Sequence, residues 1–559
     1  TIYLPKLGPN KLQDRFHFSN EKLFLIRRNH HNQIYKSLIK ALNEENTSRG
    51  LYIRGPSGLG KSYSLYYLVS ELRLQPGYKV TYIDSCEEWW KSHQLEPYQY
   101  ILNELLCTFN KDVLSPLTVT DWAEFVMHGP TTNIREKKER FVLFLKELAN
   151  FVKIEYYWIW IFDQYNDLYK YNVLNEYPFV LVNVLSEMLK GAGLIIVSET
   201  SNNEISQFKT FKPWNKLQLF DGYNNEEYNQ WCKFHGYENN AHLDTLKYWT
   251  GAYPLELNMW HKTLTSNLSN LQEITEKYLD EREDDITRNY QIYQENLSQK
   301  RIENLKKCIT SMILQTDPPT NLCDMDRRFM HIGTVSFQDG DKEVKVKTVV
   351  ANYPYIRLAI IHFYGYKIID DLNVTTSAIL QKDKYTNNVK ERIVVSYITT
   401  TLDIVETFEF KCRKFSRPNL VVFDKSIRFD RVMRFFDNDI FLTNDLTEYN
   451  DLLFIPESSN YPGVDFLIWN RDDKVIFAFQ ITISELNDRK NIDNFMIKSD
   501  GLSLRSKWAN LFGINESKIY LIWIVQDNII NKFIKKHSNR LYIPFSSIKN
   551  QFPAFNLDE

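Results

Sequence analysis

Short apolar runs recur along the first 220 residues, and segments with apolar positions at helical spacing separate them. The runs that predict strands are 51–54, 79–83, 156–162 and 194–198. Helical spacing is clearest in 63–74 and 134–152. Because strands that alternate with helices usually form a parallel sheet, the pattern predicts such a sheet covered by helices.

The pattern changes near residue 224. Strand-like runs stop until about residue 314, and polar segments with helical periodicity, such as 271–290, indicate an all-helical lid. Alternating positions return around the turn Asp339-Gly340-Asp341, which predicts a small winged or β-containing unit. Further along, helices mix with predicted strands at 463–469, 475–483 and 519–525.

The length of the chain also requires several domains, because 559 residues are too many for one hydrophobic core. We therefore expect an α/β multidomain protein. Its predicted parts are an N-terminal segment (1–21), a sheet domain (22–223), a helical lid (224–324), a winged or β-containing unit (325–374) and a C-terminal α/β domain (375–559).

Composition narrows the choice of partners. Hydrophobic residues make up 43% and charged residues 25% of the chain, as in ordinary globular proteins. The 68 Lys and Arg nearly cancel the 70 Asp and Glu, so DNA would need a local basic patch. The longest apolar run, 156–162, is far shorter than the roughly 20 residues that span a bilayer, so we expect no membrane partner. The six cysteines form no CxxC pair, which favours free thiols in a reducing compartment.

One glycine-rich segment, GPSGLGKS, lies between a predicted strand and a predicted helix and has the pattern of a phosphate-binding loop. Its glycines let backbone amides surround phosphates at the positive end of the helix. Lys61 adds a positive charge, and Ser62 adds a hydroxyl ligand for Mg²⁺. The sheet domain is therefore predicted to be a P-loop NTPase that binds ATP and Mg²⁺. The predicted cofactor-binding residues are Gly55, Pro56, Ser57, Gly58, Leu59, Gly60, Lys61 and Ser62.

A second acidic motif supports this prediction. Asp163 ends the apolar run and is expected to hold Mg²⁺ through water. Gln164 follows, where many ATPases place the glutamate that polarises the attacking water. Gln164 would orient a water without accepting its proton, or Asp167 would serve instead, so slow turnover and a nucleotide-gated switch both stay open. The polar run 198–201 is either beside the γ-phosphate or a simple turn.

A different chemistry is predicted near residue 465. Asp465 precedes one strand and Gln480 ends its hairpin neighbour, so both side chains would approach one divalent ion. The backbone of Ile481 would add a carbonyl ligand. This is the layout of restriction-endonuclease-like PD-(D/E)XK nucleases, with Gln480 in place of the usual second acid.

Several segments together resemble the Crinkler effectors and their relatives, the retrotransposon hot spot proteins. The similar segments are FLIRR at 24–28, Asp163-Gln164, DRRF at 326–329, and FQITIS at 479–484 followed by Lys490. The resemblance covers roughly residues 22–540, and Asn487 stands where the family has a histidine. It implies a P-loop ATPase fused to an endonuclease-like domain, secreted by fungi or oomycetes and acting in the host cell nucleus.

The break at 251–255 resembles the glycine-proline element of signal-transduction ATPases, in which Pro approaches the nucleotide; an interhelical turn is the alternative.

Further residues are candidates for the nuclease chemistry. Glu391, near the start of a helical run, would face the metal, although a solvent-facing charge is the alternative. Thr482 occupies the usual lysine position, so Lys490 would supply the charge unless it is an ordinary surface lysine. Lys425, Arg428, Arg431 and Arg434 recur at every third position and predict one positive helical face that contacts phosphate or solvent.

The preferred interpretation is that ATP controls a Mg²⁺-dependent endonuclease that cleaves duplex host DNA. One alternative is a non-catalytic effector whose nuclease-like domain binds DNA or a host protein. Another is a nucleotide-controlled scaffold that assembles into a homo-oligomer, such as a dimer.

Overall fold

The computed structural model places most of the chain. The residues it describes are 2–5, 16, 18–19, 22–43, 50–93, 98–109, 134–152, 154–171, 177–189, 193–199, 214–237, 242–263, 271–322, 325–339, 342–382, 385–435, 446, 449–457, 463–483, 495, 503–531 and 540–555. They belong to two compact units. Unit 1 is Thr1–Asn240, Thr250–Asn267 and Arg327–Phe329, and unit 2 is Ala241–Trp249, Leu268–Asp326 and Met330–Glu559.

Unit 1 contains a five-stranded sheet in which every strand is parallel to its neighbours, in the order β5-β6-β7-β4-β8. Its strands are β4 (Gly50–Arg54), β5 (Tyr78–Ile83), β6 (Tyr157–Phe162), β7 (Gly193–Ser198) and β8 (Asn215–Gln218). The predicted parallel sheet is confirmed. Strand β8 was not predicted, because its sequence NKLQ is polar and only half-buried at the sheet edge.

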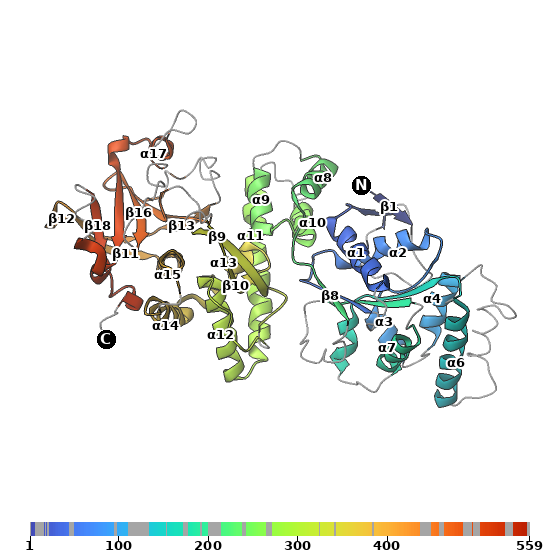
Figure 1. Ribbon diagram of the computed structural model, residues 1–559. Helices are drawn as coiled ribbons and strands as arrows, with labels where there is room; N and C mark the ends of the chain where they lie inside the picture. The colour runs from blue at the N-terminus through green and yellow to red at the C-terminus, as the bar shows by residue number, and fades with distance from the viewer. Residues whose placement is uncertain are drawn as a thin grey trace. The chain divides into compact units, whose positions relative to one another are not determined.

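Helices cover both faces of this sheet (Figure 1). One face carries α1 (Asn29–Asn43) and α2 (Lys61–Arg73). The other carries α3 (Cys86–His93), α4 (Gln99–Phe109), α6 (Ile134–Val152) and α7 (Tyr177–Met188). An aromatic core that includes Trp89, Trp158, Trp160 and Phe162 lies on this second face and fixes the strands. The short helix η1 (Tyr165–Tyr171) follows β6, and a small antiparallel sheet joins β1 (Ile2–Pro5), β3 (Lys22–Leu25) and β2 (Phe18–Ser19).

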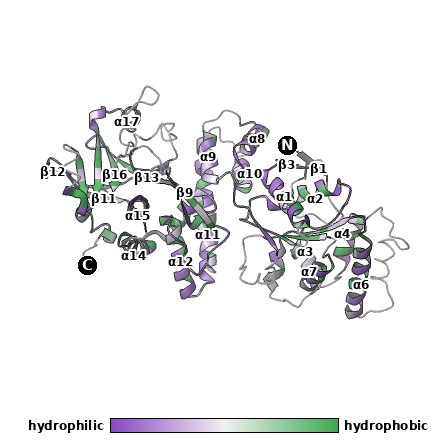
Figure 2. Cartoon of the chain, viewed as in Figure 1, coloured by the Kyte–Doolittle hydropathy of each residue, from purple (hydrophilic) through white to green (hydrophobic). Residues whose placement is uncertain are grey.

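The segment predicted to be a helical lid is helical, but its helices are divided between the two units. Unit 1 holds α8 (Asn225–His235) and α10 (Pro254–Thr263). Unit 2 holds α11 (Leu271–Glu295), α12 (Gln299–Leu314) and nearly all of α9 (His242–Thr250). Helix α11 is largely hydrophilic, whereas hydrophobic residues concentrate in the strands (Figure 2).

An antiparallel hairpin of β9 (Met330–Asp339) and β10 (Lys342–Ala351) stands where the sequence predicted a β-containing unit. Four helical segments follow it in the chain. They are α13 (Pro354–Tyr364), η3 (Gly365–Ile368), α14 (Ile369–Leu380) and α15 (Asn387–Val405).

The rest of unit 2 is built on an eight-stranded mixed sheet, ordered β12-β11-β18-β17-β16-β15-β14-β13. Its strands are β11 (Thr407–Lys414), β12 (Arg417–Arg428), β13 (Arg431–Phe435), β14 (Asp451–Pro456), β15 (Phe466–Asn470), β16 (Val475–Thr482), β17 (Ile519–Val525) and β18 (Leu541–Pro544). Strands β14, β15 and β16 form an antiparallel meander, and β17 then pairs parallel with β16. Helix α17 (Leu504–Leu511) buries Trp508 against the meander. The short helices are η6 (Glu516–Lys518), η7 (Asp527–Ile529), η8 (Phe545–Ser547) and η9 (Pro553–Phe555).

Two simpler expectations also concern the described residues. Cys86, Cys107, Cys232, Cys308 and Cys412 are free, as the spacing predicted, and Cys323 lies outside the described ranges. Across those ranges, no helix has the length and apolar character needed to cross a membrane.

Candidate functional site

The glycine-rich loop connects β4 to α2, as the sequence predicted. Gly58 and Gly60 have φ values of 79° and 87°, a left-handed conformation that glycine adopts without strain. The Lys61 side chain is buried, and its Nζ donates to the carbonyl oxygens of Gly55 at 2.8 Å and Pro56 at 2.6 Å. The ammonium group therefore lies across the inside of the loop, and half-buried Ser62 is next to it at the start of α2. Strand, loop and helix together define a P-loop fold.

The proline element of the lid reaches this loop. Gly251 and Ala252 are both left-handed, with φ values of 58° and 52°, and Pro254 then begins α10. The backbone N–H of Leu255 donates to the carbonyl oxygen of Gly58 at 3.2 Å. A Cβ atom on Gly58 would lie 2.7 Å from Leu255, so α10 packs directly on the tip of the loop. The interpretation that this break approaches the nucleotide loop is favoured over a simple interhelical turn.

Arg28, in the FLIRR segment, holds the loop from another side. Its guanidinium group donates to the carbonyl oxygen of Leu59 in the loop, and to those of Asp221 and Gly222 at 2.9 Å each. Its Nε lies 3.7 Å from the carboxylate of Glu227. Sequence reasoning used this segment only as part of a family resemblance and missed the arginine's contact with the loop.

Asp163 lies where the sequence predicted, directly after β6. Its Oδ1 accepts hydrogen bonds from the Ser198 hydroxyl and, at 2.9 Å, from the backbone N–H of Gln164. The backbone of Gln164 has a left-handed conformation, with φ of 55°, and its side chain is half-buried. Asp167 is buried on η1, and its N–H donates to the Gln164 carbonyl at 2.9 Å. Asp163 is therefore held at the carboxyl edge of the sheet, one strand away from the P-loop strand.

Between these two strands lies an acid that was only part of a predicted polar run. Glu199 follows β7, and its N–H donates to the Ile53 carbonyl at 3.0 Å. The side chain is 2% exposed, and burial raises its pKa to about 7, although the Tyr52 hydroxyl and the charges of Arg327, Arg54 and Lys61 lower it. The signal for this residue was the polar strand end; Thr200 and Ser201 lie outside the described residues.

The predicted pair in unit 2 is also brought together. The backbone N–H of Asp465 donates to the Phe479 carbonyl at 2.7 Å, and the Ile481 N–H donates to Asp465 Oδ2 at 2.6 Å. Pairing of Phe466 with Phe479 places Asp465 opposite Gln480. Gln480 is 3% exposed, and its Oε1 has no hydrogen-bond partner among the described residues. Burial raises the pKa of Asp465 to about 7.

A carboxylate and an orphaned amide oxygen are the hard donors that Mg²⁺ prefers, so these two residues fit the expected ion. They supply only part of an octahedral shell. Nowhere in the described ranges do three or more His, Cys, Asp or Glu side chains gather to hold a metal. The group of Ile481 that contacts Asp465 is its N–H, whereas the sequence predicted a role for its carbonyl.

The other nuclease candidates have different outcomes. Glu391 lies on α15, which packs against β16, and it is only 3% exposed, so the solvent-facing alternative is wrong. Thr482 is buried two residues after Gln480 and shares its face of the strand. Lys490 lies outside the described residues.

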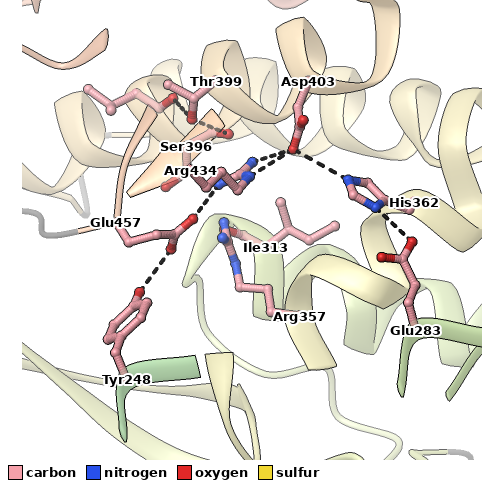
Figure 3. A network of polar contacts seen from close by, with 11 residues as sticks. Tyr248, Glu283, Ile313, Arg357, His362, Ser396, Thr399, Asp403, Arg434 and Glu457 are labelled. Atoms are coloured by element: carbon pink, nitrogen blue, oxygen red, sulfur yellow. Dashed lines mark hydrogen bonds and ion pairs between the residues drawn. The ribbon is translucent and has the colours of Figure 1, made fainter. Parts of the chain in front are cut away.

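The predicted basic helical face is wrong, because the segment forms strands β12 and β13. Lys425 pairs with Asp473, and Arg434 is buried between Asp403 and Glu457 at 2.7 Å from each (Figure 3). Spacing of three gathers residues on one side of a helix, but successive residues of a strand alternate between faces. Arg428 and Arg431 remain exposed.

No family model matches the chain, and no curated protein matches it. Among solved structures, the chain is similar to the Walker-type ATPase PABY2304 of Pyrococcus abyssi, with 11% identity, a TM-score of 0.37, and coverage of 60% of this chain and 96% of that one. It is also similar to C. elegans PCH-2, with 12% identity, a TM-score of 0.24, and coverage of 45% and 67%. Drosophila ORC bound to DNA has 15% identity, a TM-score of 0.27, and coverage of 67% and 86%. The assignment of a P-loop fold rests on the loop geometry rather than on these likenesses.

Proposed function

We propose that the protein binds ATP with Mg²⁺ at the P-loop and hydrolyses it. The observation that carries this proposal is the Lys61 ammonium group, held inside a glycine loop by two of the loop's own carbonyl oxygens. A buried cation is costly, and phosphate oxygens would compensate its charge. The loop amides and Lys61 would bind the β- and γ-phosphates, while Ser62 and Asp163 would hold Mg²⁺.

Calorimetry with ATP and Mg²⁺ tests this proposal. We expect Lys61→Ala to weaken ATP binding at least about tenfold, because a charge-assisted contact to phosphate is lost. Lys40→Ala, at an exposed position on α1, is the matched control and should bind like the wild type. Equal affinity in all three proteins would remove the proposal.

A second function is proposed for unit 2, which would be a Mg²⁺-dependent endonuclease on duplex DNA under the control of ATP. Its support is the buried oxygen pair of Asp465 and Gln480, together with the resemblance to Crinkler effectors. A bound Mg²⁺ would polarise the scissile phosphate and activate a water. Asp465 would bind the ion after losing its proton, Gln480 would bind it through Oε1, and Glu391 and Lys490 are proposed to assist. Secretion and action in the host nucleus belong to the same proposal.

Plasmid nicking in Mg²⁺ compared with EDTA tests the second function. We expect nicks that require Mg²⁺ and depend on Asp465. DNA binding without nicking would instead favour a non-catalytic effector. A particle size that changes with ATP, again without nicking, would favour an oligomerising scaffold.

A further inference from the structure

Hydrolysis at the P-loop leaves open which side chain accepts the proton of the attacking water. The residue after Asp163 is Gln164, and a neutral amide cannot act as a base. In two other acids at this edge of the sheet, one carboxylate oxygen is already hydrogen-bonded. Asp84 accepts from the Tyr100 hydroxyl at 2.7 Å, and Asp163 accepts from Ser198 and the Gln164 N–H.

Glu199 is placed between the two halves of the nucleotide site. Strand β7 lies between β6, which Asp163 follows, and β4, which leads into the P-loop. The Glu199 N–H is bonded to Ile53, two residues before Gly55, and the preceding residue, Ser198, is bonded to Asp163. The backbone of Glu199 is therefore fixed on both sides, between the strand that leads into the P-loop and Asp163.

Its carboxyl group has an unused acceptor. The side chain is 2% exposed, and Oε2 has no hydrogen-bond partner within the part of the chain that the structure describes. A buried acceptor without a partner destabilises the folded protein unless a ligand or water completes it. The charged and titratable groups around it are Tyr52 and Arg54 on β4, Lys61 on α2, and Arg327.

We propose that Glu199 is the general base for ATP hydrolysis, an inference that rests on the proposed ATPase function. Glu199 Oε2 takes a proton from water as the water oxygen forms a bond to the γ-phosphorus. The bond from the γ-phosphorus to the β,γ-bridging oxygen breaks, and its electron pair leaves with ADP. Glu199 then returns the proton to solvent, which restores the carboxylate.

The electrostatics suit this role. Burial raises the pKa of Glu199 to about 7, and the Tyr52 hydroxyl together with the three nearby cations keeps the pKa from rising further. A base with a pKa near the working pH is present as carboxylate in a substantial fraction and still binds a proton well. An ordinary glutamate, with a pKa of about 4.3, would be a weaker base.

The decisive variant is Glu199→Gln, which keeps the shape and removes the base. We expect ATP affinity within about threefold of the wild type and turnover lower by about 100-fold or more. Turnover of the wild type should fall with decreasing pH below about 7, because the base becomes protonated, and Glu199→Gln should lose this dependence. Glu187→Gln, at an exposed glutamate on α7, is the control and should leave the rate and the pH profile unchanged.

Three outcomes would overturn the assignment. Wild-type turnover in Glu199→Gln would exclude the residue as base. Loss of ATP binding in that variant would instead make Glu199 a group that positions the loop. Normal turnover in Glu199→Gln with a large loss in Asp167→Asn would make Asp167 the base. Because wild-type ATP binding is measured separately, failure of the ATPase proposal itself would be recognised by its absence.

Discussion

Buried acids behave differently in two regions of this molecule. In unit 2, Glu457 and Asp403 flank Arg434, and the Tyr248 hydroxyl donates to Glu457 at 3.1 Å (Figure 3). Burial raises the pKa of Glu457, but Arg434 and Arg357 outweigh burial and lower it below its usual value. At the P-loop, burial dominates instead and raises the pKa of Glu199.

This difference in pKa distinguishes buried acids that stabilise the fold from buried acids that could take part in a reaction. The ion pairs of Arg434 join β13 to α15, and Tyr248 brings in α9 (Figure 3). His362 extends the network, because its ring lies 2.9 Å from Glu283 on α11 and 4.0 Å from Asp403. Each acid there has a charged partner, so the network stabilises packing. An unpaired buried acid destabilises the fold, and such groups mark functional sites more often than paired ones do.

The largest effect is expected on stability, when the ion pairs of Arg434 are removed. Arg434→Met should lower the free energy of unfolding by about 3–5 kcal/mol, because two buried carboxylates lose their shared partner. Urea denaturation measures the change. Arg428→Met, at an exposed position on β12, should change it by less than about 0.5 kcal/mol. Similar effects of the two variants would mean that the network is not structural.

Asp465→Asn tests a second buried acid whose pKa is raised by burial, as that of Glu199 is. A folded-state pKa of about 7 lies above the unfolded value of about 3.9, so Asp465 contributes stability at acid pH that is lost as pH rises through 7. The Tm of the wild type in EDTA should therefore fall between about pH 4 and pH 7, and the fall should be smaller in Asp465→Asn. Mg²⁺ should raise the Tm of the wild type above pH 7 but not that of the variant. An equal response to Mg²⁺ would exclude Asp465 as a ligand.

The smallest expected effect is on ATP turnover and concerns Gln164. Gln164→Glu should raise ATP turnover several-fold while leaving affinity nearly unchanged, because a carboxylate polarises water better than an amide does. Steady-state phosphate release measures turnover. An unchanged or lower rate would show that Gln164 does not face the attacking water.

Much of unit 1 could be predicted because its signals are local. Apolar runs bounded by polar residues identify β4, β5, β6 and β7, and the glycine loop requires left-handed residues at Gly58 and Gly60. The Asp465 and Gln480 pair was also predictable, since a hairpin brings neighbouring strand ends together. The basic stripe was misinterpreted, because spacing of three in 425–434 fits a helix while pairing with β11 and β14 selects strands.

The sequence by itself determined the phosphate loop, the alternation that forms the parallel sheet and the residues available for chemistry. Only the tertiary structure decided which acids are paired, because Tyr248, Asp403, Arg434 and Glu457 are far apart in the chain and meet by packing alone. It also decided that Glu199 is buried beside Lys61, Arg54 and Arg327. Desolvation and Coulomb interactions depend on distance in space, so the chemistry of a buried carboxylate follows from the fold rather than from its sequence neighbours.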